Sequence, residues 1–200
     1  KILNRVKLEI PNLIGGSADL APSNKTYLSD MGDFAKNSYA GRNLHFGVRE
    51  LAMTAITNGI ILHGGLKAYC ATFFVFSDYT KPMARLSSLM GIPASFVFTH
   101  DSIGVGEDGP THEPIEQLAM LRAMPNFHSF RPADATETLA AWYSALKSEK
   151  TPTAIILTRQ NLPQLAGSSK EALKGGYVIK EASRANIDLI LIASGSEVAL

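Results

Sequence analysis

The sequence predicts an α/β protein with a doubly wound, mostly parallel sheet and helices on both of its faces. Three observations support this class. Short runs of β-branched and aromatic residues recur along the chain, segments with apolar residues at helical spacing separate them, and glycines follow several of these segments. Strands that alternate with helices are typical of parallel sheets, because a parallel connection needs a crossover of a dozen or more residues.

The expected elements alternate from the start of the chain to about residue 158. Gly64 and Gly91 each follow a long helical segment, as expected of residues that end helices. Asp134 and Glu137 have the spacing of a capping box at the start of the last helix. The expected strands are 12–16, 42–47, 68–74, 94–99, 128–130 and 153–158, and the expected helical segments are 50–65, 77–90, 114–122 and 134–146.

Composition narrows the class of protein. Apolar residues make up 46% of the chain and charged residues 18%, which is enough apolar material for a sizeable core. The net charge of +1, without a basic block, argues against nucleic acid or an anionic membrane as partner. The apolar run Ile187–Ala193 is far shorter than the roughly 20 residues of a membrane span. Cys70 is the only cysteine, so no internal disulfide forms, as expected of a cytoplasmic protein.

The chain divides into three parts on composition. Residues 1–160 are expected to form one α/β domain, and residues 161–176, rich in Gly, Ser, Pro and Lys, are expected to be a linker. Residues 177–200 then resemble the start of a second α/β domain. The chain opens on KILNRV, like the tail of a helix, and stops at SEVAL, like the first turn of another. We therefore expect a fragment of a longer protein.

Polar residues follow several of the expected strands. They are Ser17 and Asp19, Glu50, His100 and Arg159. Because ligands bind at the carboxyl ends of the strands in doubly wound sheets, these residues are expected to share the ligand edge. Taken singly, each has an ordinary alternative: Glu50 suits the first turn of a helix, and Arg159 suits a structural ion pair.

The 99–114 segment, THDSIGVGEDGPTHEP, combines two histidines and four acids with glycines. A metal site is disfavoured, since His100 and His112 are twelve residues apart without a companion ligand at a known spacing. A phosphate cradle is also disfavoured, since two acids lie within GVGEDG. A polar substrate clamp and a plain solvated loop both remain open. The nearby aromatics, Phe73, Phe74, Phe76 and Tyr79, and the lone Trp142 are expected in the core.

Five motifs together resemble the central, pyrimidine-binding domain of transketolase. They are GGSADLAPSN (15–24), HFGVRE (45–50), ATFFVFSDY (71–79), the 99–114 segment and LTRQNLP (157–163). The resemblance runs from near the first residue to the end, where the chain is similar to the start of the family's C-terminal domain. Five long motifs in the family's order make it specific.

The resemblance implies an enzyme that uses thiamine diphosphate to move a two-carbon ketol unit from a ketose phosphate to an aldose phosphate. It further implies a cytoplasmic homodimer of the pentose phosphate pathway. Glu50 is similar to the glutamate that hydrogen-bonds N1′ of the aminopyrimidine, where it promotes loss of the thiazolium C2 proton. The resemblance implies that His112 is the second catalytic residue, at the sugar.

The resemblance also assigns the other site residues. Those implied to bind the cofactor, besides Glu50, are Asp19 near the thiazolium, Phe76 stacked on the aminopyrimidine, and Phe73 and Tyr79 in the same pocket. Those implied to bind the sugar are Asp108 and His112, at its carbonyl and hydroxyl groups. Those implied to bind its phosphate are Ser23, His100 and Arg159.

The family's motif for the metal ion and the diphosphate is not visible here. Residues 106–109, GEDG, imitate its opening, but the asparagine expected some 25–30 residues later is missing from DATETL (134–139). The resemblance implies that Mg²⁺ or Ca²⁺ is held by the absent N-terminal domain and that this fragment is inactive alone. Dihydroxyacetone synthase, deoxyxylulose phosphate synthase and a non-catalytic dimerisation module remain alternatives.

Overall fold

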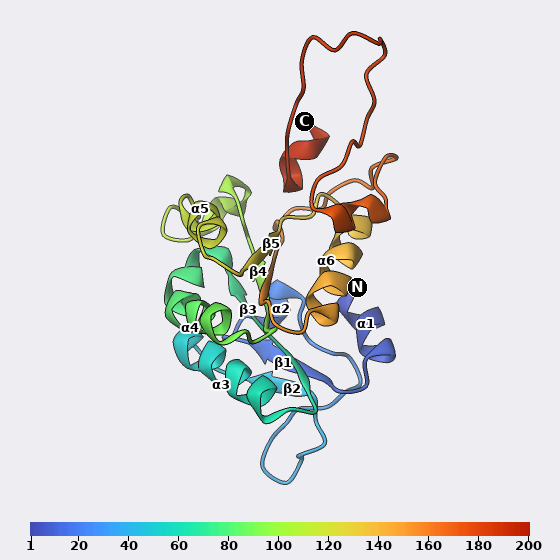
Figure 1. Cartoon of the computed structure of the whole chain (residues 1–200). Helices are drawn as coiled ribbons and strands as arrows, with labels where there is room; N and C mark the ends of the chain where they lie inside the picture. The colour runs from blue at the N-terminus through green and yellow to red at the C-terminus, as the bar shows by residue number, and fades with distance from the viewer.

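The computed structural model describes all residues, 1–200, and has a six-stranded sheet at its centre (Figure 1). Every neighbouring pair of strands is parallel, in the order β2-β1-β3-β4-β6-β5. The predicted α/β class with a doubly wound parallel sheet is confirmed. The strands are β1 (Leu13–Ser17), β2 (Asn43–His45), β3 (Lys67–Phe73), β4 (Ser95–Thr99), β5 (His128–Phe130) and β6 (Thr153–Ile156).

Helices cover both faces of this sheet, as predicted (Figure 1). α3, α4 and α5 lie on one face, and α1 and α6 lie on the other. No helix has the length and apolar character needed to cross a membrane. The α-helices are α1 (Leu3–Glu9), α2 (Ala21–Asn24), α3 (Glu50–His63), α4 (Ser77–Met90), α5 (Gln117–Arg122) and α6 (Ala135–Lys147). The 3₁₀ turns are η1 (Phe74–Phe76), η2 (Ile103–Asp108), η3 (Lys170–Lys174) and η4 (Gly195–Ala199).

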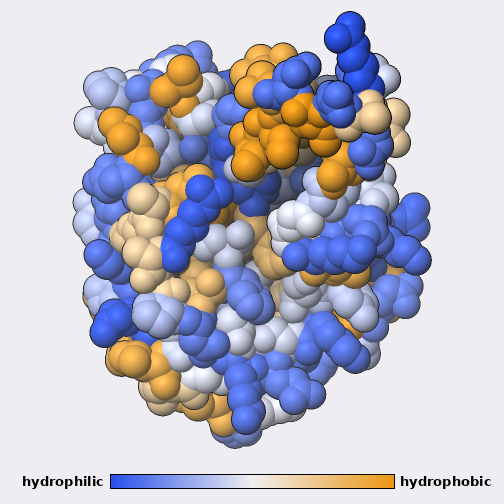
Figure 2. All heavy atoms as spheres, turned by 45° about the horizontal axis from the view of Figure 1, so that its top comes forward, coloured by the Kyte–Doolittle hydropathy of each residue, from blue (hydrophilic) through white to orange (hydrophobic).

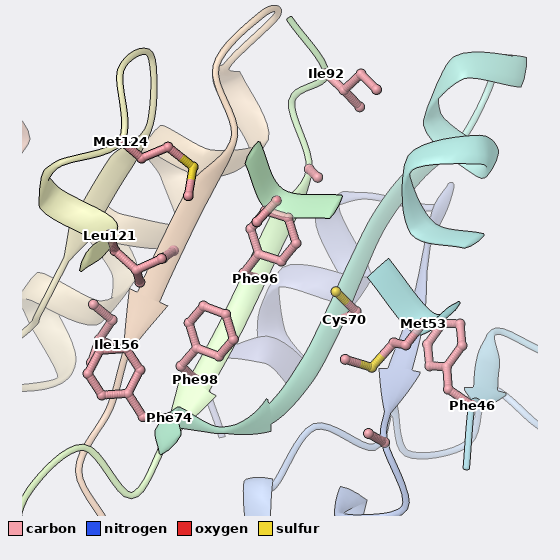
Figure 3. Packing of buried hydrophobic residues seen from close by; sticks show 14 residues of the cluster. Phe46, Met53, Cys70, Phe74, Ile92, Phe96, Phe98, Leu121, Met124 and Ile156 are labelled. Carbon is pink, nitrogen blue, oxygen red and sulfur yellow. The ribbon is translucent and has the colours of Figure 1, made fainter. Parts of the chain in front are cut away.

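The core beneath α3, α4 and α5 is centred on two phenylalanines of β4 (Figure 3). Phe96 and Phe98 point to the same side of the strand, since side chains two residues apart share a face of a sheet. Their rings are stacked, with centroids 6.1 Å apart and planes at 4°. Met53 of α3 and Leu121 of α5 are buried in the same cluster. Each such side chain stabilises the fold by about 1.5–3 kcal/mol.

The core on the opposite face joins α1 and α6 to the sheet. Trp142 of α6 is buried, as predicted, and meets the ring of Tyr69 from β3 edge-on at 6.0 Å. The Tyr69 hydroxyl donates a hydrogen bond to the carbonyl of Thr26 at 2.6 Å, so this large side chain is buried without an unpaired polar group. Leu3 and Val6 of α1 complete the cluster.

Two helix ends follow the predicted local signals. Gly91 ends α4 in the left-handed conformation, with φ of 64°. At the start of α6, the Asp134 carboxylate accepts a hydrogen bond from the amide of Glu137 at 3.0 Å. The Glu137 carboxylate in turn accepts from the amide of Ala133 at 2.8 Å, one residue before the cap. The Asp134 half of the capping box therefore forms as expected, and the reciprocal bond of Glu137 is shifted by one residue.

Several predicted boundaries were wrong, among them the following. The helix expected from Pro114 begins at Gln117, whose side chain accepts a hydrogen bond from the amide of Ile115 at 2.8 Å. The strand expected through Phe74 ends one residue earlier, because Phe74 opens the turn η1. The strand expected over 42–47 pairs only from Asn43 to His45, on the outer edge of the sheet.

Residues 161–200 contain only the 3₁₀ turns η3 and η4 and no strand or α-helix. Much of this part forms a long excursion at the top of the molecule (Figure 1). Leu191 and Ile192 within it are 86% and 92% exposed. In Figure 2, which turns that end toward the viewer, apolar side chains gather at the surface of this end. The assignment of 161–176 as a linker and of 177–200 as the start of another domain stays a prediction.

Gly16 lies where β1 passes closest to β2, and we expect Gly16→Ala to destabilise the protein. An added Cβ would lie 1.7 Å from the carbonyl oxygen of Leu44, its partner in the parallel register. That oxygen belongs to the backbone, so relief requires the two strands to separate. Urea unfolding should show a loss of roughly 1–3 kcal/mol.

Gly59→Ala is the matched control for this substitution. Gly59 lies inside α3, and an added Cβ there meets no atom within 4 Å. Alanine favours the helix more than glycine, so the variant should gain about 0.5–1 kcal/mol. Similar stabilities for the two variants would contradict the close approach of β1 and β2.

Candidate active site

The carboxyl ends of the parallel strands meet at one edge of the sheet. Asp19 follows β1, Glu50 follows β2, His100 follows β4 and Arg159 follows β6. The strand order arranges them along this edge as Glu50, Asp19, His100 and then Arg159. Ligand sites of doubly wound sheets lie at this kind of edge.

An open pocket lies where the connections of the sheet diverge. The chain passes from β1 to β2 on one side and then to β3 on the other side of β1. A crevice is expected outside the carboxyl ends of β1 and β3, because the two connections leave on opposite sides. A pocket of about 540 Å³ occupies this position. Its lining residues are Ala18, Asp19, Leu20, Val48, Glu50, Phe76 and Tyr79.

Glu50 brings a carboxylate to this pocket. It is the first residue of α3 and is only 7% exposed. Its Oε1 accepts a hydrogen bond from the hydroxyl of Thr72 on β3 at 3.4 Å. The amide groups at the start of a helix also favour a negative charge there. The other carboxylate oxygen, Oε2, has no hydrogen bond within the chain and is available to a ligand in the pocket.

A row of rings runs from the pocket toward the end of β4. Phe73 lies against His100 with centroids 3.8 Å apart, and against Phe76 in a parallel stack at 6.2 Å. Phe76 is followed by Tyr79, also at 6.2 Å. The expectation that these aromatics are core residues is right for Phe73 and wrong for Tyr79, which is 61% exposed. Tyr79 is instead a wall of the pocket.

The 99–114 segment folds over this row of rings. Its central turn, η2, bends at Gly106, where φ is 73° and ψ is −111°. His112 meets the Phe76 ring edge-on at 5.3 Å, and its Nδ1 lies 2.9 Å from the hydroxyl of Thr111. No three His, Cys, Asp or Glu side chains in the chain come together as a metal site would require. The contact with Phe76 favours the substrate clamp over the plain loop.

Several charged groups surround His100. Burial lowers the pKa of His100 below its ordinary value of 6.5; Asp108 acts against this effect, and Arg159 adds to it. These interactions bring the predicted residues Asp108 and Arg159 into the electrostatic environment of one imidazole. Arg159 also contacts Glu107 at 3.5 Å, in an exposed and therefore weak ion pair.

Ser23 is the one predicted residue without a contact in this group. It lies exposed on α2 and makes no hydrogen bond within the chain. Its neighbour Asn24 is buried, however, and accepts a hydrogen bond from Thr99 at 2.6 Å. This bond holds α2, which carries Ser23, beside the start of the 99–114 segment.

Sequence reasoning missed a buried ion pair beside the site. Arg131 follows β5, and its Nε donates to Oδ2 of Asp101 at 2.5 Å. The two side chains are 11% and 1% exposed. Arg131 also donates to the carbonyl of Ser194 at 2.7 Å and contacts Glu197, which ties the last residues to this edge. The acid in THDS was visible in the sequence, but no local pattern links it to Arg131.

A parallel sheet of this order, with a carboxylate and aromatic rings in the crevice at its switch point, defines a ligand-binding α/β domain. Residues 1–164 match the family model described as "Transketolase, pyrimidine binding domain". The chain belongs to the transketolase family, as its pyrimidine-binding domain.

Relatives and solved structures agree with this assignment. The chain is 57% identical to a transketolase of Bacillus subtilis over 204 residues and 59% identical to a probable transketolase of Streptococcus pneumoniae over 199 residues. The matches cover 100% and 99% of this chain, but only 31% and 30% of those relatives. A Pichia stipitis transketolase, solved with sedoheptulose 7-phosphate, matches with a TM-score of 0.95 and 51% identity over 98% of this chain and 30% of that one.

We expect Arg131→Met to destabilise the protein strongly. The substitution leaves the Asp101 carboxylate buried without its cation, and removing one partner of a buried pair costs about 3–5 kcal/mol. Chemical unfolding followed by circular dichroism measures the loss. Arg159→Met is the control, because its pair with Glu107 is exposed and should contribute less than about 1 kcal/mol. Equal losses in the two variants would show that the buried pair does not stabilise this edge.

Proposed function

We propose that this chain forms the aminopyrimidine and sugar-phosphate half of a transketolase active site. The complete enzyme transfers a two-carbon ketol unit from a ketose phosphate to an aldose phosphate with thiamine diphosphate. The observation that carries the proposal is that Glu50 and Phe76 line one pocket at the switch point of the sheet. The relatives named transketolase support it, as does the Pichia stipitis structure with a sugar phosphate.

The residues present fit the aminopyrimidine ring. A carboxylate with one free oxygen suits a ring nitrogen that shares a proton, and a flat side chain suits the face of the ring. Glu50 and Phe76 supply these two groups within a pocket of about 540 Å³. Tyr79 and Asp19 line the same pocket, whereas Phe73, expected there too, is not among its lining residues and stacks on Phe76 instead. Thiamine diphosphate, when bound, supplies the carbon nucleophile of the reaction.

Glu50 holds the proton on which the cofactor's activation depends. In this proposal its free oxygen, Oε2, shares a proton with N1′ of the aminopyrimidine, while Thr72 holds Oε1. The burial of Glu50 keeps water from competing for that proton. A carboxyl group is needed because an amide at this position cannot give or take the proton.

The sugar lies along the row of rings, from the pocket toward Arg159. His112 contacts the ring of Phe76 and is placed to hold the sugar's carbonyl group, with Asp108 at the hydroxyls. His100, Ser23 and Arg159 bind the phosphate, where the guanidinium of Arg159 can donate two hydrogen bonds to its oxygens. The pair with Glu107 is long and exposed, so a phosphate can displace it.

The remaining parts of the enzyme lie outside this chain. We propose that another domain binds the diphosphate and its Mg²⁺ or Ca²⁺ ion, and that a second subunit completes each site in a homodimer of the cytoplasm. The chain spans about 31% of the length of the Bacillus subtilis relative, which supports this division. A domain of residues 1–160 followed by a linker is part of the same proposal. The names of the relatives favour transketolase over dihydroxyacetone synthase or deoxyxylulose phosphate synthase.

Glu50→Gln in the full-length enzyme should nearly abolish ketol transfer. The amide fills the same space but cannot exchange a proton with the cofactor, so kcat should fall by roughly 10²–10⁴-fold. Steady-state kinetics with a ketose phosphate and an aldose phosphate measures this loss. Glu149→Gln is the control, since Glu149 is exposed in the loop before β6, at the opposite edge of the sheet. Turnover of Glu50→Gln near that of the control would refute the role of Glu50.

Arg159→Ala should weaken phosphorylated substrates selectively. A charge-assisted pair with phosphate contributes about 1.5–3 kcal/mol, so KM for a phosphorylated aldose should rise roughly 10–150-fold. KM for the same sugar without its phosphate should change little. Arg122→Ala, an exposed arginine on α5, serves as the control. Equal changes for both sugars would exclude phosphate as the partner of Arg159.

A further inference from the structure

A buried chain of hydrogen bonds crosses the sheet edge and ends at His100. The Ser17 hydroxyl donates to the carbonyl of Ala71 at 3.0 Å. Asn24 Nδ2 donates to Ser17 Oγ at 2.8 Å, and Thr99 Oγ1 donates to Asn24 Oδ1 at 2.6 Å. Thr99 Oγ1 also lies 2.9 Å from Nδ1 of His100. The chain therefore joins the ends of β1, β3 and β4.

The carbonyl at one end determines the direction of every bond in this chain. A carbonyl only accepts, so the single Ser17 proton goes to Ala71 and Ser17 Oγ must accept from the next group. The amide nitrogen of Asn24 therefore faces Ser17, and its oxygen faces Thr99. The proton of the Thr99 hydroxyl then goes to that oxygen, so the hydroxyl can only accept from the next residue.

His100 must consequently carry its proton on Nδ1. The Thr99 hydroxyl has no second proton to give, and the contact at 2.9 Å is a hydrogen bond only if Nδ1 donates it. Nε2 makes no hydrogen bond within the chain and is not among the polar atoms buried without a partner, so it faces solvent. The backbone at His100, with φ of 61°, and the stack on Phe73 hold the ring in this position.

We propose that Asn24 and Thr99 are positioning residues that keep neutral His100 in the Nδ1–H form, so that a phosphate group binds at Nε2 only together with a proton. The second half of this statement rests on the proposed function, in which His100 meets the phosphate. A bare Nε2 presents a lone pair, which repels a phosphate dianion. A proton taken up on binding turns Nε2 into a donor and His100 into a cation.

The groups that face His100 support an uptake of one proton. Burial keeps the pKa of free His100 below 6.5, so the ring is neutral at neutral pH. Arg159 and His112 also disfavour the cation, whereas Asp108 and Asp101 favour it. The two negative charges of a bound phosphate act in the same direction as Asp108 and Asp101. Together these charges stabilise the protonated form of His100.

Neutron diffraction from deuterated crystals of the full-length protein directly tests whether neutral His100 carries its proton on Nδ1. At pH about 8, above the ordinary pKa of histidine, we expect nuclear density for deuterium on Nδ1 of His100 and none on Nε2. Density on Nε2 with a bare Nδ1 would overturn the proposal. The measurement needs no substrate, so it stands or fails independently of the proposed function.

A matched pair of variants at Thr99 tests whether the Thr99 hydroxyl determines the proton position on His100. Thr99→Ser keeps the hydroxyl and should keep the deuterium on Nδ1. Thr99→Val has nearly the same shape without the hydroxyl, so the ring loses its fixed acceptor and deuterium should appear on Nε2 in part or in full. The same protonation in all three proteins would show that the hydrogen-bond chain does not determine it.

Calorimetry tests the phosphate step with ribose 5-phosphate, offered without a ketose donor. Titrations at pH about 8 in two buffers of different ionisation enthalpy count the protons taken up, and the phosphate is then a dianion, since its second pKa is about 6. We expect about one proton per phosphate in the parent protein and in Thr99→Ser, and clearly fewer in Thr99→Val. Binding without proton uptake in the parent protein would overturn this step. An absence of phosphate binding would refute both this step and the proposed role of His100, but not the diffraction result.

Discussion

The parallel ladder between β1 and β3 is the constraint on which the site depends. Leu13 through Ser17 pair in register with Lys67 through Ala71. Because the two strands end side by side while their connections leave in opposite directions, the crevice between them opens at their carboxyl ends. The carboxylate that follows β2 and the rings that follow β3 then meet in that crevice. A shift of the ladder would separate them.

The ladder is held by packing on both faces of the sheet. Phe96 and Phe98 anchor the side of α3, α4 and α5, and Trp142 anchors the side of α6. Between these two cores the strands approach closely: a Cβ at Gly15 would lie 2.3 Å from the carbonyl oxygen of Tyr69. Close-packed interiors of this kind resist displacement. Rigid strands can therefore carry reactive groups on the short turns that follow them.

A row of aromatic rings and a chain of hydrogen bonds link the parts of the site along the sheet edge. The row of rings from Tyr79 to His100 joins the pocket at Glu50 to the end of β4. The hydrogen-bond chain from Ser17 to Thr99 reaches the same histidine from within the fold. His100 is thus held by a stacked ring and by a directed hydrogen bond. An imidazole restrained in both ways has one orientation and one neutral proton position.

Local signals were sufficient at two helix ends, where the deciding atoms lie within a few residues of one another. The cap by Asp134 and the stop at Gly91 both formed as predicted, because a helix end is satisfied by its immediate neighbours. The start of α5 was wrong because the side chain of Gln117 binds the amide of Ile115 in place of another turn of helix. The proposed roles of Glu50, Phe76 and Arg159 came from family resemblance, since an acid or an arginine after a strand has ordinary alternatives.

By itself, the sequence determined the α/β class, the sheet edge that carries the polar residues and the family to which the chain belongs. Only the tertiary structure decided which side chains at that edge contact one another and in which direction their hydrogen bonds run. Asn24 and Thr99 are 75 residues apart, and Arg131 reaches Asp101 across 30. Such pairs exist only because the sheet brings strands that are distant in sequence close together: only β3 lies between β1 and β4, and only β6 lies between β4 and β5. Spacing along a chain reports helix faces and strand faces, whereas contacts between strands depend on the order in which the sheet assembles.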